Sequence, residues 1–239
     1  MPRETAVSTT RLRKVKLTRK YTKFAPGSVL IEQGDTRVIC TASVEQRVPP
    51  FVAETSGWLT AEYAMLPGCT PFRKSREVKQ GKPDGRGVEI SRLIGRCLRC
   101  AVDLEKMPGV TVTVDCDVIQ ADGGTRCASI TGGMVALCDA FAWMKHKGLI
   151  AESPLRHFLA AVSVGIVDGK PVLDLCYAQD SRAEVDMNVV MTEDARFVEL
   201  QGTAEGEPFS EKQLSALRRL ATNGIAQLIA AQKKCLEIK

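Results

Sequence analysis

The stretch from Val110 to Gly133 constrains the fold more than any other part of the chain. Its first half alternates apolar and polar residues with a period of two, which predicts a β-strand. The alternation stops at Asp122-Gly123-Gly124, and from Ala128 to Gly148 the apolar residues recur at helical spacing. This segment therefore predicts a strand that turns on a glycine pair into a helix.

A strand–glycine–helix turn has two interpretations. The unpaired N–H groups and the dipole of the new helix, with Arg126 close by, would suit a bound anion. The alternative is a tight connection whose glycines only permit positive φ angles. The Thr125-Arg126 pair after the glycines gives the two interpretations about equal weight.

The composition is that of an ordinary globular protein. The 239 residues are 44% hydrophobic and 26% charged, and a chain of this length can bury a full core. A net charge of +5 is compatible with a polyanionic partner without requiring one. Aromatic residues make up only 5%, so we do not expect base stacking to dominate any binding of single-stranded nucleic acid.

The cysteines and the N-terminal sequence bear on the compartment. The N-terminal residues show no apolar stretch of the secretory type, and no run approaches the roughly 18 apolar residues of a membrane span. We therefore expect a cytoplasmic protein without a membrane partner, whose nine cysteines act mainly as small apolar residues. Cys97 and Cys100 form a C-x-x-C pair, but its helical context and the lack of a nearby histidine argue against a zinc or redox site.

Strand pairs and helices alternate along the chain in two similar rounds. Turns at Gly34-Asp35 and Asp168-Gly169 each predict a hairpin. Helical patterns cover 88–103 and the segment that begins at Ser210, where Gln213 completes a capping box. No repeat is strong enough to divide the chain. We predict a single α+β domain over residues 1–239, with mixed β-sheets packed against helices.

Two charged segments are candidates for a functional site. Residues 67–87 form a loop rich in glycine and proline with six basic residues, namely Arg73, Lys74, Arg76, Lys79, Lys82 and Arg86. We favour a functional loop over a solvated charge run, because loops of this length inside compact domains tend to be functional. Arg86, just before the predicted helix, could reach an anion at the N-terminus of that helix.

The second charged segment contains the acids Asp180, Glu184 and Asp186, which could bind Mg²⁺ or form a solvated acidic turn. With an anion cradle and a basic loop, the metal site is favoured, and the combination indicates phosphoryl transfer on a nucleic-acid backbone. The only two histidines, His146 and His157, lie away from the glycine turn, which argues against a Ser-His-Asp arrangement.

Four motifs together resemble a known enzyme family. They are Gly57–Tyr63, Gln120–Gly132, Asp186–Thr192 and Gln201–Phe209. These motifs closely resemble those of ribonuclease PH, in the same order and over nearly the whole chain. The resemblance implies a ribonuclease PH-type fold and a phosphorolytic 3′→5′ exoribonuclease, or tRNA nucleotidyltransferase. Such an enzyme trims transfer RNA precursors beyond their CCA end and releases nucleoside diphosphates, and in reverse it extends RNA from them.

The same resemblance implies roles for individual residues. Inorganic phosphate, the co-substrate, would be held by Arg86, Gly124, Thr125 and Arg126, of which Arg126 would also be catalytic. Asp180 and Asp186 would be the catalytic carboxylates and the ligands of Mg²⁺ or Mn²⁺. Arg73 and Arg76 would contact RNA. The implied assembly is a homohexamer, a trimer of dimers, that acts on transfer RNA precursors and other RNA 3′ ends. Gly68 departs from the family, whose loop often carries an arginine at that position.

Two other functions stay open. A hydrolytic two-metal nuclease would use the same acids but release monophosphates, and it would need a larger carboxylate cluster. A non-catalytic RNA-binding subunit of a ring would need neither the arginines nor the aspartates. The presence of Arg86, Arg126, Asp180 and Asp186 argues against this second alternative.

Overall fold

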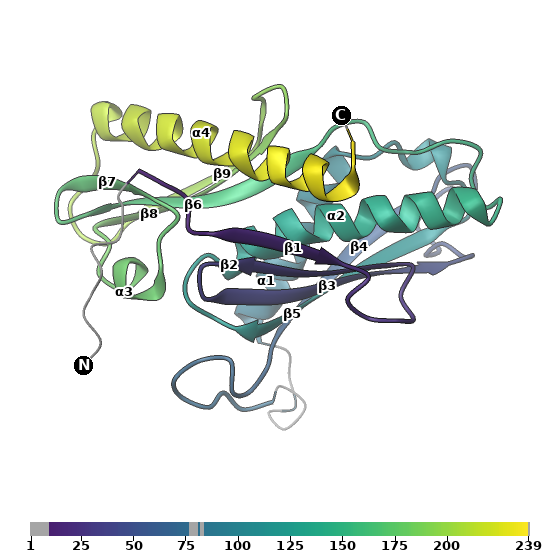
Figure 1. The fold of residues 1–239 in the computed structure, drawn as a ribbon, viewed down its shortest axis with the longest axis horizontal. Helices are drawn as coiled ribbons and strands as arrows, with labels where there is room; N and C mark the ends of the chain where they lie inside the picture. The colour runs from purple at the N-terminus through teal and green to yellow at the C-terminus, as the bar shows by residue number, and fades with distance from the viewer. Residues whose placement is uncertain (1–9, 77–80, 82–83, 239) are drawn as a thin grey trace.

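The computed structural model describes residues 10–76, 81 and 84–238, and within these residues it contains two β-sheets with helices packed against them (Figure 1). The first sheet is mixed, with strand order β1-β2-β3-β5-β4, and the second is antiparallel, with order β7-β6-β8-β9. The predicted α+β class is confirmed.

In the first sheet, β1 (Val15–Arg19) is an edge strand, and β2 (Gly27–Gln33) and β3 (Thr36–Glu45) form the expected hairpin around Gly34. The other edge strand, β4 (Trp58–Met65), runs parallel to β5 (Thr111–Gln120). A parallel pair requires a crossover, and α1 (Gly85–Cys100) supplies it. Because of this crossover, the basic segment lies between the end of β4 and the start of α1.

The second sheet begins with a hairpin of β6 (Leu159–Val167) and β7 (Lys170–Leu173), closed at Asp168-Gly169 as expected. It continues through β8 (Val185–Thr192) and β9 (Phe197–Ala204). The last helix, α4 (Glu211–Leu236), has the predicted capping box of Ser210 and Gln213, and Figure 1 shows it lying along the second sheet.

The helix α2 (Thr125–His146) lies between the two sheets and contacts strands of both. Fourteen of its 22 residues are buried, so protein covers most of its circumference. Its length and composition would allow it to cross a membrane, but 78% of its apolar window is buried in the protein. It is therefore the central helix of the core. The main apolar cluster includes α2 and residues of both sheets. That the chain folds as one domain stays a prediction.

Several element boundaries differ from those expected. The helix α1 begins three residues before Val88, because Asp84 caps it, and so Arg86 lies inside its first turn. The helix α2 begins at Thr125 rather than Ala128, because the left-handed conformation of Gly124 starts it earlier. A short 3₁₀ helix, Leu104–Lys106, follows α1.

The second hairpin also ends earlier than expected. The strand β7 stops at Leu173, before the positive φ of Asp174, and an unexpected one-turn helix, α3 (Tyr177–Asp180), follows. The side chain of Gln179 accepts a hydrogen bond from the backbone N–H of Cys176 and caps this helix. In the basic segment, Lys79 and Lys82 lie outside the described residues.

The close packing of α2 on β2 makes a stability prediction. A Cβ added at Gly27 would stand 1.8 Å from the backbone carbonyl oxygen of Ala136, whereas one at Gly68 would meet nothing within 4 Å. We expect Gly27→Ala to lower the free energy of unfolding by about 3 kcal/mol or more, because neither backbone can shift cheaply. Urea denaturation of this variant, with Gly68→Ala as the matched control, checks the expectation. Equal stability of the two variants would contradict it.

Candidate active site

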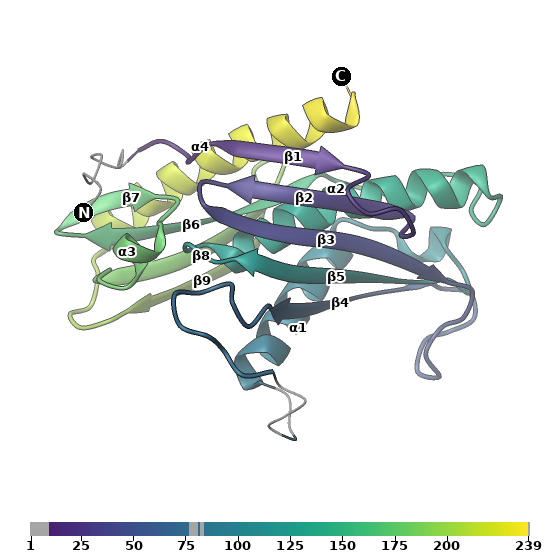
Figure 2. The ribbon, with the colours of Figure 1, turned by 60° about the horizontal axis from the view of Figure 1, so that its bottom comes forward.

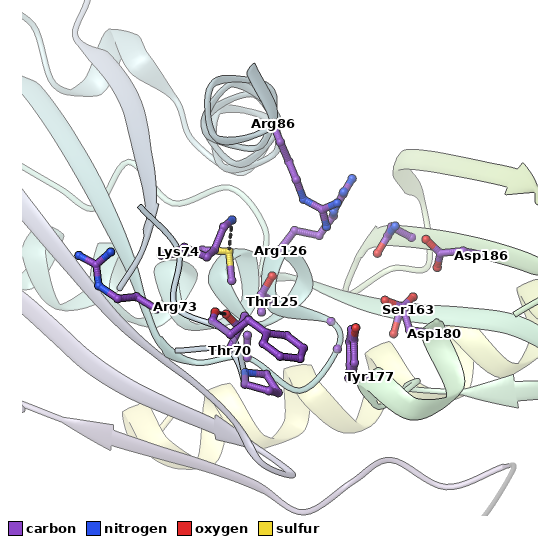
Figure 3. A pocket seen from close by; sticks show the side chains of 17 residues that line it. Thr70, Arg73, Lys74, Arg86, Thr125, Arg126, Ser163, Tyr177, Asp180 and Asp186 are labelled. Carbon is purple, nitrogen blue, oxygen red and sulfur yellow. Dashed lines mark hydrogen bonds between the residues drawn. The ribbon is translucent and has the colours of Figure 1, made fainter. Parts of the chain in front are cut away.

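A cavity of about 550 Å³ opens where the beginnings of α1 and α2 meet α3 and β8 (Figure 3). Figure 2 shows β5 ending beside the second sheet, so the turn into α2 lies at the junction of the two sheets. The cavity is lined by four cationic side chains, two carboxylates and the glycine turn. The charged residues are Arg73, Lys74, Arg86, Arg126, Asp180 and Asp186. The excess of positive charge favours an anionic ligand.

The glycine turn requires glycine for two physical reasons. Gly123 and Gly124 have φ angles of 74° and 65°, which are strained for other residues. A Cβ on Gly123 would also lie 2.4 Å from the carbonyl oxygen of Leu175. Gly124 is the N-cap of α2 and offers no side-chain acceptor, so no side chain of the described residues caps the first N–H groups of the helix. The turn is thus both a tight connection and a source of free donors beside the cavity.

Arg13 holds this turn from the side of the N-terminal segment. Its guanidinium donates to the carbonyl oxygens of Asp122 (2.6 Å) and Gly123 (3.4 Å) and to the Asp174 carboxylate (2.7 Å). Asp174 is 1% exposed and also accepts from the Gln33 amide at 2.8 Å. Burial opposes the charge on Arg13, but the hydrogen bond and charge of Asp174 outweigh it and raise the pKa of Arg13. The predictions missed this residue, which is distant in sequence from the turn.

Arg126 and Thr125 begin α2 and are oriented by other elements. One guanidinium nitrogen of Arg126 donates to the side-chain oxygen of Gln201 at 2.9 Å and lies 3.9 Å from Glu89. The hydroxyl of Thr125 pairs with the hydroxyl of Tyr63 at 2.9 Å. Burial raises the pKa of Tyr63, although this hydrogen bond and the charges of the cavity arginines oppose the rise. Tyr63 therefore remains a neutral phenol and fixes the Thr125 side chain.

The two predicted carboxylates lie together on the other wall of the cavity. Asp180 ends α3 and Asp186 is near the start of β8. Burial raises the pKa of both, and the charge of Asp180 raises that of Asp186 further, while Arg86 and Arg126 oppose these shifts. The third acid, Glu184, is directed elsewhere and accepts from the backbone N–H of Gly169 at 2.9 Å.

Two polar residues near these acids were not predicted. Asn188 follows Asp186 by two positions on β8 and so faces the same side. Ser163 is its partner on β6, and both line the cavity. The two-residue alternation after Asp186 is the sequence signal that could have found Asn188. Ser163 depends on the pairing of β6 with β8, which the sequence does not contain.

The residues present fit a hard divalent cation bound by a carboxylate pair. Mg²⁺ usually takes one or two carboxylates and completes its shell with phosphate oxygens and water. Across residues 10–76, 81 and 84–238, neither Asp180 nor Asp186 forms a side-chain hydrogen bond or ion pair, so their oxygens are available. The same part of the chain contains no cluster of three or more such ligands.

Of the two residues predicted to contact RNA, the structure places only one at the cavity. Arg73 lines the cavity, together with Lys74, which was not predicted to contact RNA. Arg76 is exposed and does not line it. Gly68 is also exposed, and the space around it would accept a larger side chain. The absence of an arginine there is therefore not imposed by packing.

Comparison with known families decides the classification. The sequence matches the RNase PH models of the 3′ exoribonuclease family, domain 1 over residues 11–142 and domain 2 over residues 157–224. The chain belongs to this family. The cavity takes its glycine turn from the first matched region and its carboxylates from the second.

Solved structures share the fold. Rrp46 of rice (Oryza sativa) matches with a TM-score of 0.79 and 18% identity, over 98% of this chain and 100% of that one. The exosome of Archaeoglobus fulgidus with RNA bound to the active site matches with a TM-score of 0.79 and 23% identity, over 98% and 91%. An archaeal exosome core matches with a TM-score of 0.78 and 22% identity, over 95% and 89%. At these identities the likeness shows the fold alone.

The buried pair of Arg13 and Asp174 makes a second prediction. We expect Arg13→Leu to lower the free energy of unfolding by about 3–5 kcal/mol, because it leaves a buried carboxylate without its cation. The double variant Arg13→Leu/Asp174→Leu should recover part of the loss, since it contains no unpaired charge. Urea denaturation measures both, with the exposed Arg11→Leu as control. A double variant less stable than Arg13→Leu would contradict the expectation.

The raised pKa values of Asp180 and Asp186 make a prediction about pH. Because the folded-state pKa exceeds the ordinary value of 3.8, the stability that the protonated acids contribute is fully present below pH 3.8 and is lost as pH rises through the higher, folded-state pKa. We therefore expect Asp180→Asn/Asp186→Asn to melt at a higher temperature than the wild type at neutral pH. The advantage should shrink towards pH 3.8.

Asp194 provides a control of opposite sign. The hydrogen bond from the Thr192 hydroxyl lowers the pKa of Asp194, so Asp194→Asn should melt below the wild type at neutral pH. Thermal melts across the pH range test both expectations. A double variant that melts below the wild type at neutral pH would show that burial does not oppose the ionisation of the cavity acids.

Proposed function

We propose that this protein is a phosphorolytic 3′→5′ exoribonuclease that removes 3′ nucleotides from RNA with inorganic phosphate and releases nucleoside diphosphates. One observation carries the proposal. The start of α2, which no side chain in the described part of the protein caps, and the guanidinium groups of Arg86 and Arg126 border the same cavity as Asp180 and Asp186. An anion site beside a pair of acids is the arrangement that phosphate attack on a phosphodiester needs. Membership of the 3′ exoribonuclease family supports the same chemistry.

One side of the cavity, here called the phosphate wall, consists of the start of α2 with Arg126 and of Arg86. Its groups are oriented before the ligand arrives. The first N–H groups of α2 and the guanidinium of Arg126 bind the anion, and Arg86 approaches from the first turn of α1 (Figure 3). Gln201 holds Arg126, and Tyr63 holds the Thr125 hydroxyl. Donors fixed in this way stabilise the charge that develops during an in-line attack without further reorganisation.

The other side of the cavity, here called the acid wall, consists of Asp180 and Asp186. In the proposed reaction these residues assist the departure of the 3′ oxygen. We assign the binding of Mg²⁺ or Mn²⁺ to Asp180 and Asp186; when bound, the ion supplies positive charge to the scissile phosphate and the departing 3′ oxygen. A proton donor at a carboxyl oxygen is the alternative role for these acids when no ion is bound, because burial raises the pKa of both and favours the protonated form. Asn188 and Ser163 lie beside these acids and offer further hydrogen bonds to the substrate.

Transfer RNA precursors with extended 3′ ends are the substrates that we propose, in the cytoplasm, with a homohexamer as the working assembly. The four sequence motifs that resemble ribonuclease PH support the substrate. The fold shared with archaeal exosome cores fits a ring in which the basic segment of residues 67–87 meets the RNA.

A ring subunit that binds RNA without cleaving it is the second candidate. The fold shared with Rrp46 and with archaeal exosome cores supports a ring subunit over a dedicated transfer RNA enzyme, although one of these exosomes has RNA bound to an active site. Against it, both arginines and both aspartates of the predicted site line one cavity. A hydrolytic two-metal nuclease is less well supported, because Glu184 bonds to Gly169 and does not join the acid pair.

Product analysis separates these functions. The full chain is incubated with a 3′-extended transfer RNA and Mg²⁺, with and without inorganic phosphate, and the released nucleotides are resolved. We expect nucleoside diphosphates only when phosphate is present. Monophosphates in both reactions would show hydrolysis, and bound RNA without products would show a non-catalytic subunit.

Arg126→Ala tests the phosphate wall within the same assay. We expect kcat to fall by roughly 10²- to 10³-fold, because one preorganised donor to the developing charge is lost. Arg92→Ala is the matched control, since Arg92 is an exposed arginine of α1 that does not line the cavity. Unchanged turnover in Arg126→Ala would remove Arg126 from the mechanism.

A further inference from the structure

Two exposed aromatic side chains stand at the rim of the cavity. Phe72 is 87% exposed and Tyr177 is 57% exposed, yet both line the cavity described above. They come from different elements, Phe72 from the segment after β4 and Tyr177 from the first position of α3. Figure 3 shows Thr70 and Arg73, which lie two residues before and one residue after Phe72, to one side of Tyr177 and Asp180. Exposed large apolar residues are common on a protein surface, but these two differ from Phe24 and Leu66 because they line the cavity, where a ligand can cover them.

The position of Tyr177 is fixed by the glycine turn. The backbone N–H of Tyr177 donates to the carboxylate of Asp122 at 3.1 Å. Gly123 packs so closely on this segment that a Cβ would lie 2.9 Å from the Tyr177 nitrogen. Asp180 ends the same helical turn. The backbone that carries the aromatic ring is therefore tied to both the phosphate wall and the acid wall.

Phe72 is held by the described part of the basic segment. The carbonyl oxygen of Cys69, a buried residue, accepts from the N–H of Ala121 at 2.8 Å, next to the glycine turn. The Lys74 N–H donates to the carbonyl oxygen of Pro67 at 2.8 Å, and the Thr70 hydroxyl donates to that of Phe72 at 2.7 Å. These bonds close residues 67–74 into a turn. The turn presents the Phe72 ring at the rim, next in sequence to Arg73 and Lys74.

The charge around the rings selects the occupant. Four cations, Arg73, Lys74, Arg86 and Arg126, line the same cavity. A ligand that offers both anionic groups and flat aromatic faces satisfies the cations and the two rings together. Single-stranded nucleic acid has this chemistry, with a phosphate for each base, and stacking on aromatic rings accepts any base.

We propose that Phe72 and Tyr177 form a stacking subsite for the bases at the 3′ end of single-stranded RNA. The proposal rests on the proposed function, from which it takes RNA as the ligand and the cavity as the place of reaction. The subsite holds the end of the strand against the cavity by contacts that do not depend on sequence. From the low aromatic content we did not expect base stacking to dominate RNA binding. Composition gives the number of aromatic residues but not their positions, so it does not reveal that two of them line this cavity.

A binding experiment without turnover tests the subsite. A short single-stranded RNA with 2-aminopurine as its 3′-terminal base is titrated with the full chain in the absence of phosphate, and quenching of its fluorescence reports stacking. We expect Phe72→Leu and Tyr177→Leu each to weaken binding by roughly 5- to 100-fold and to reduce the quenching, because leucine stays apolar but lacks the aromatic face. Phe72→Trp and Tyr177→Phe should retain both.

Phe24→Leu is the matched control, because Phe24 is 92% exposed but does not line the cavity. It should bind and quench like the wild type. An RNA that ends in an abasic residue lacks the stacking base. The wild type should bind this RNA as weakly as the double variant Phe72→Leu/Tyr177→Leu binds the intact RNA. The double variant should bind the abasic RNA and the intact RNA with nearly the same affinity.

The outcomes separate this inference from the proposed function. Wild-type affinity and quenching in both leucine variants would overturn the stacking subsite, whether or not phosphate supports turnover. A loss of quenching in the leucine variants but not in Phe24→Leu would establish the subsite. If that loss is found while the wild type releases no diphosphates with phosphate, the subsite stands and the proposed catalysis fails.

Discussion

The contact between the Gly123-Gly124 turn and the segment from Leu175 to Tyr177 is the constraint on which the rest of the site depends. It brings the end of β5 and the start of α2 against α3, so that donors from one sheet face carboxylates from the other. Only glycine permits both the left-handed backbone and this approach. Arg13 and Asp174 then fix the turn with a buried, charge-assisted network.

Much of the fold could be predicted because short patterns in the sequence indicate individual strands, turns and helices. Period-two alternation marks β5, turn residues mark the hairpin between β2 and β3, and the capping box of Ser210 and Gln213 starts α4. The extra turn at the start of α1 and the single turn of α3 were missed. Their caps, Asp84 and Gln179, act through individual side-chain bonds that leave no periodic pattern.

Site residues that lie close together in sequence could be predicted, whereas those that only tertiary packing brings to the site could not. Arg126 stands two residues after the glycine pair, and Asp180 and Asp186 stand close together in sequence, so their types and spacing indicated the chemistry. Arg13, Tyr63 and Ser163 reach the site only through strand pairing and burial. Glu184 shows the converse, because nearness in sequence suggested a third ligand that hydrogen bonding directs to Gly169.

The hydrogen bonds of Thr131 carry a consequence for the whole molecule. Its hydroxyl donates to the carbonyl oxygen of Ala161 and accepts from the N–H of the same residue, which fastens α2 to β6 in the middle of the core. The phosphate wall stands at one end of α2, and the acid Asp186 stands on β8, the neighbour of β6. In the proposed reaction, the separation between the attacking phosphate and the departing 3′ oxygen is therefore set by the interior of the protein. A substitution deep in that interior can therefore change the distance between the two walls of the cavity without replacing any residue that lines the cavity.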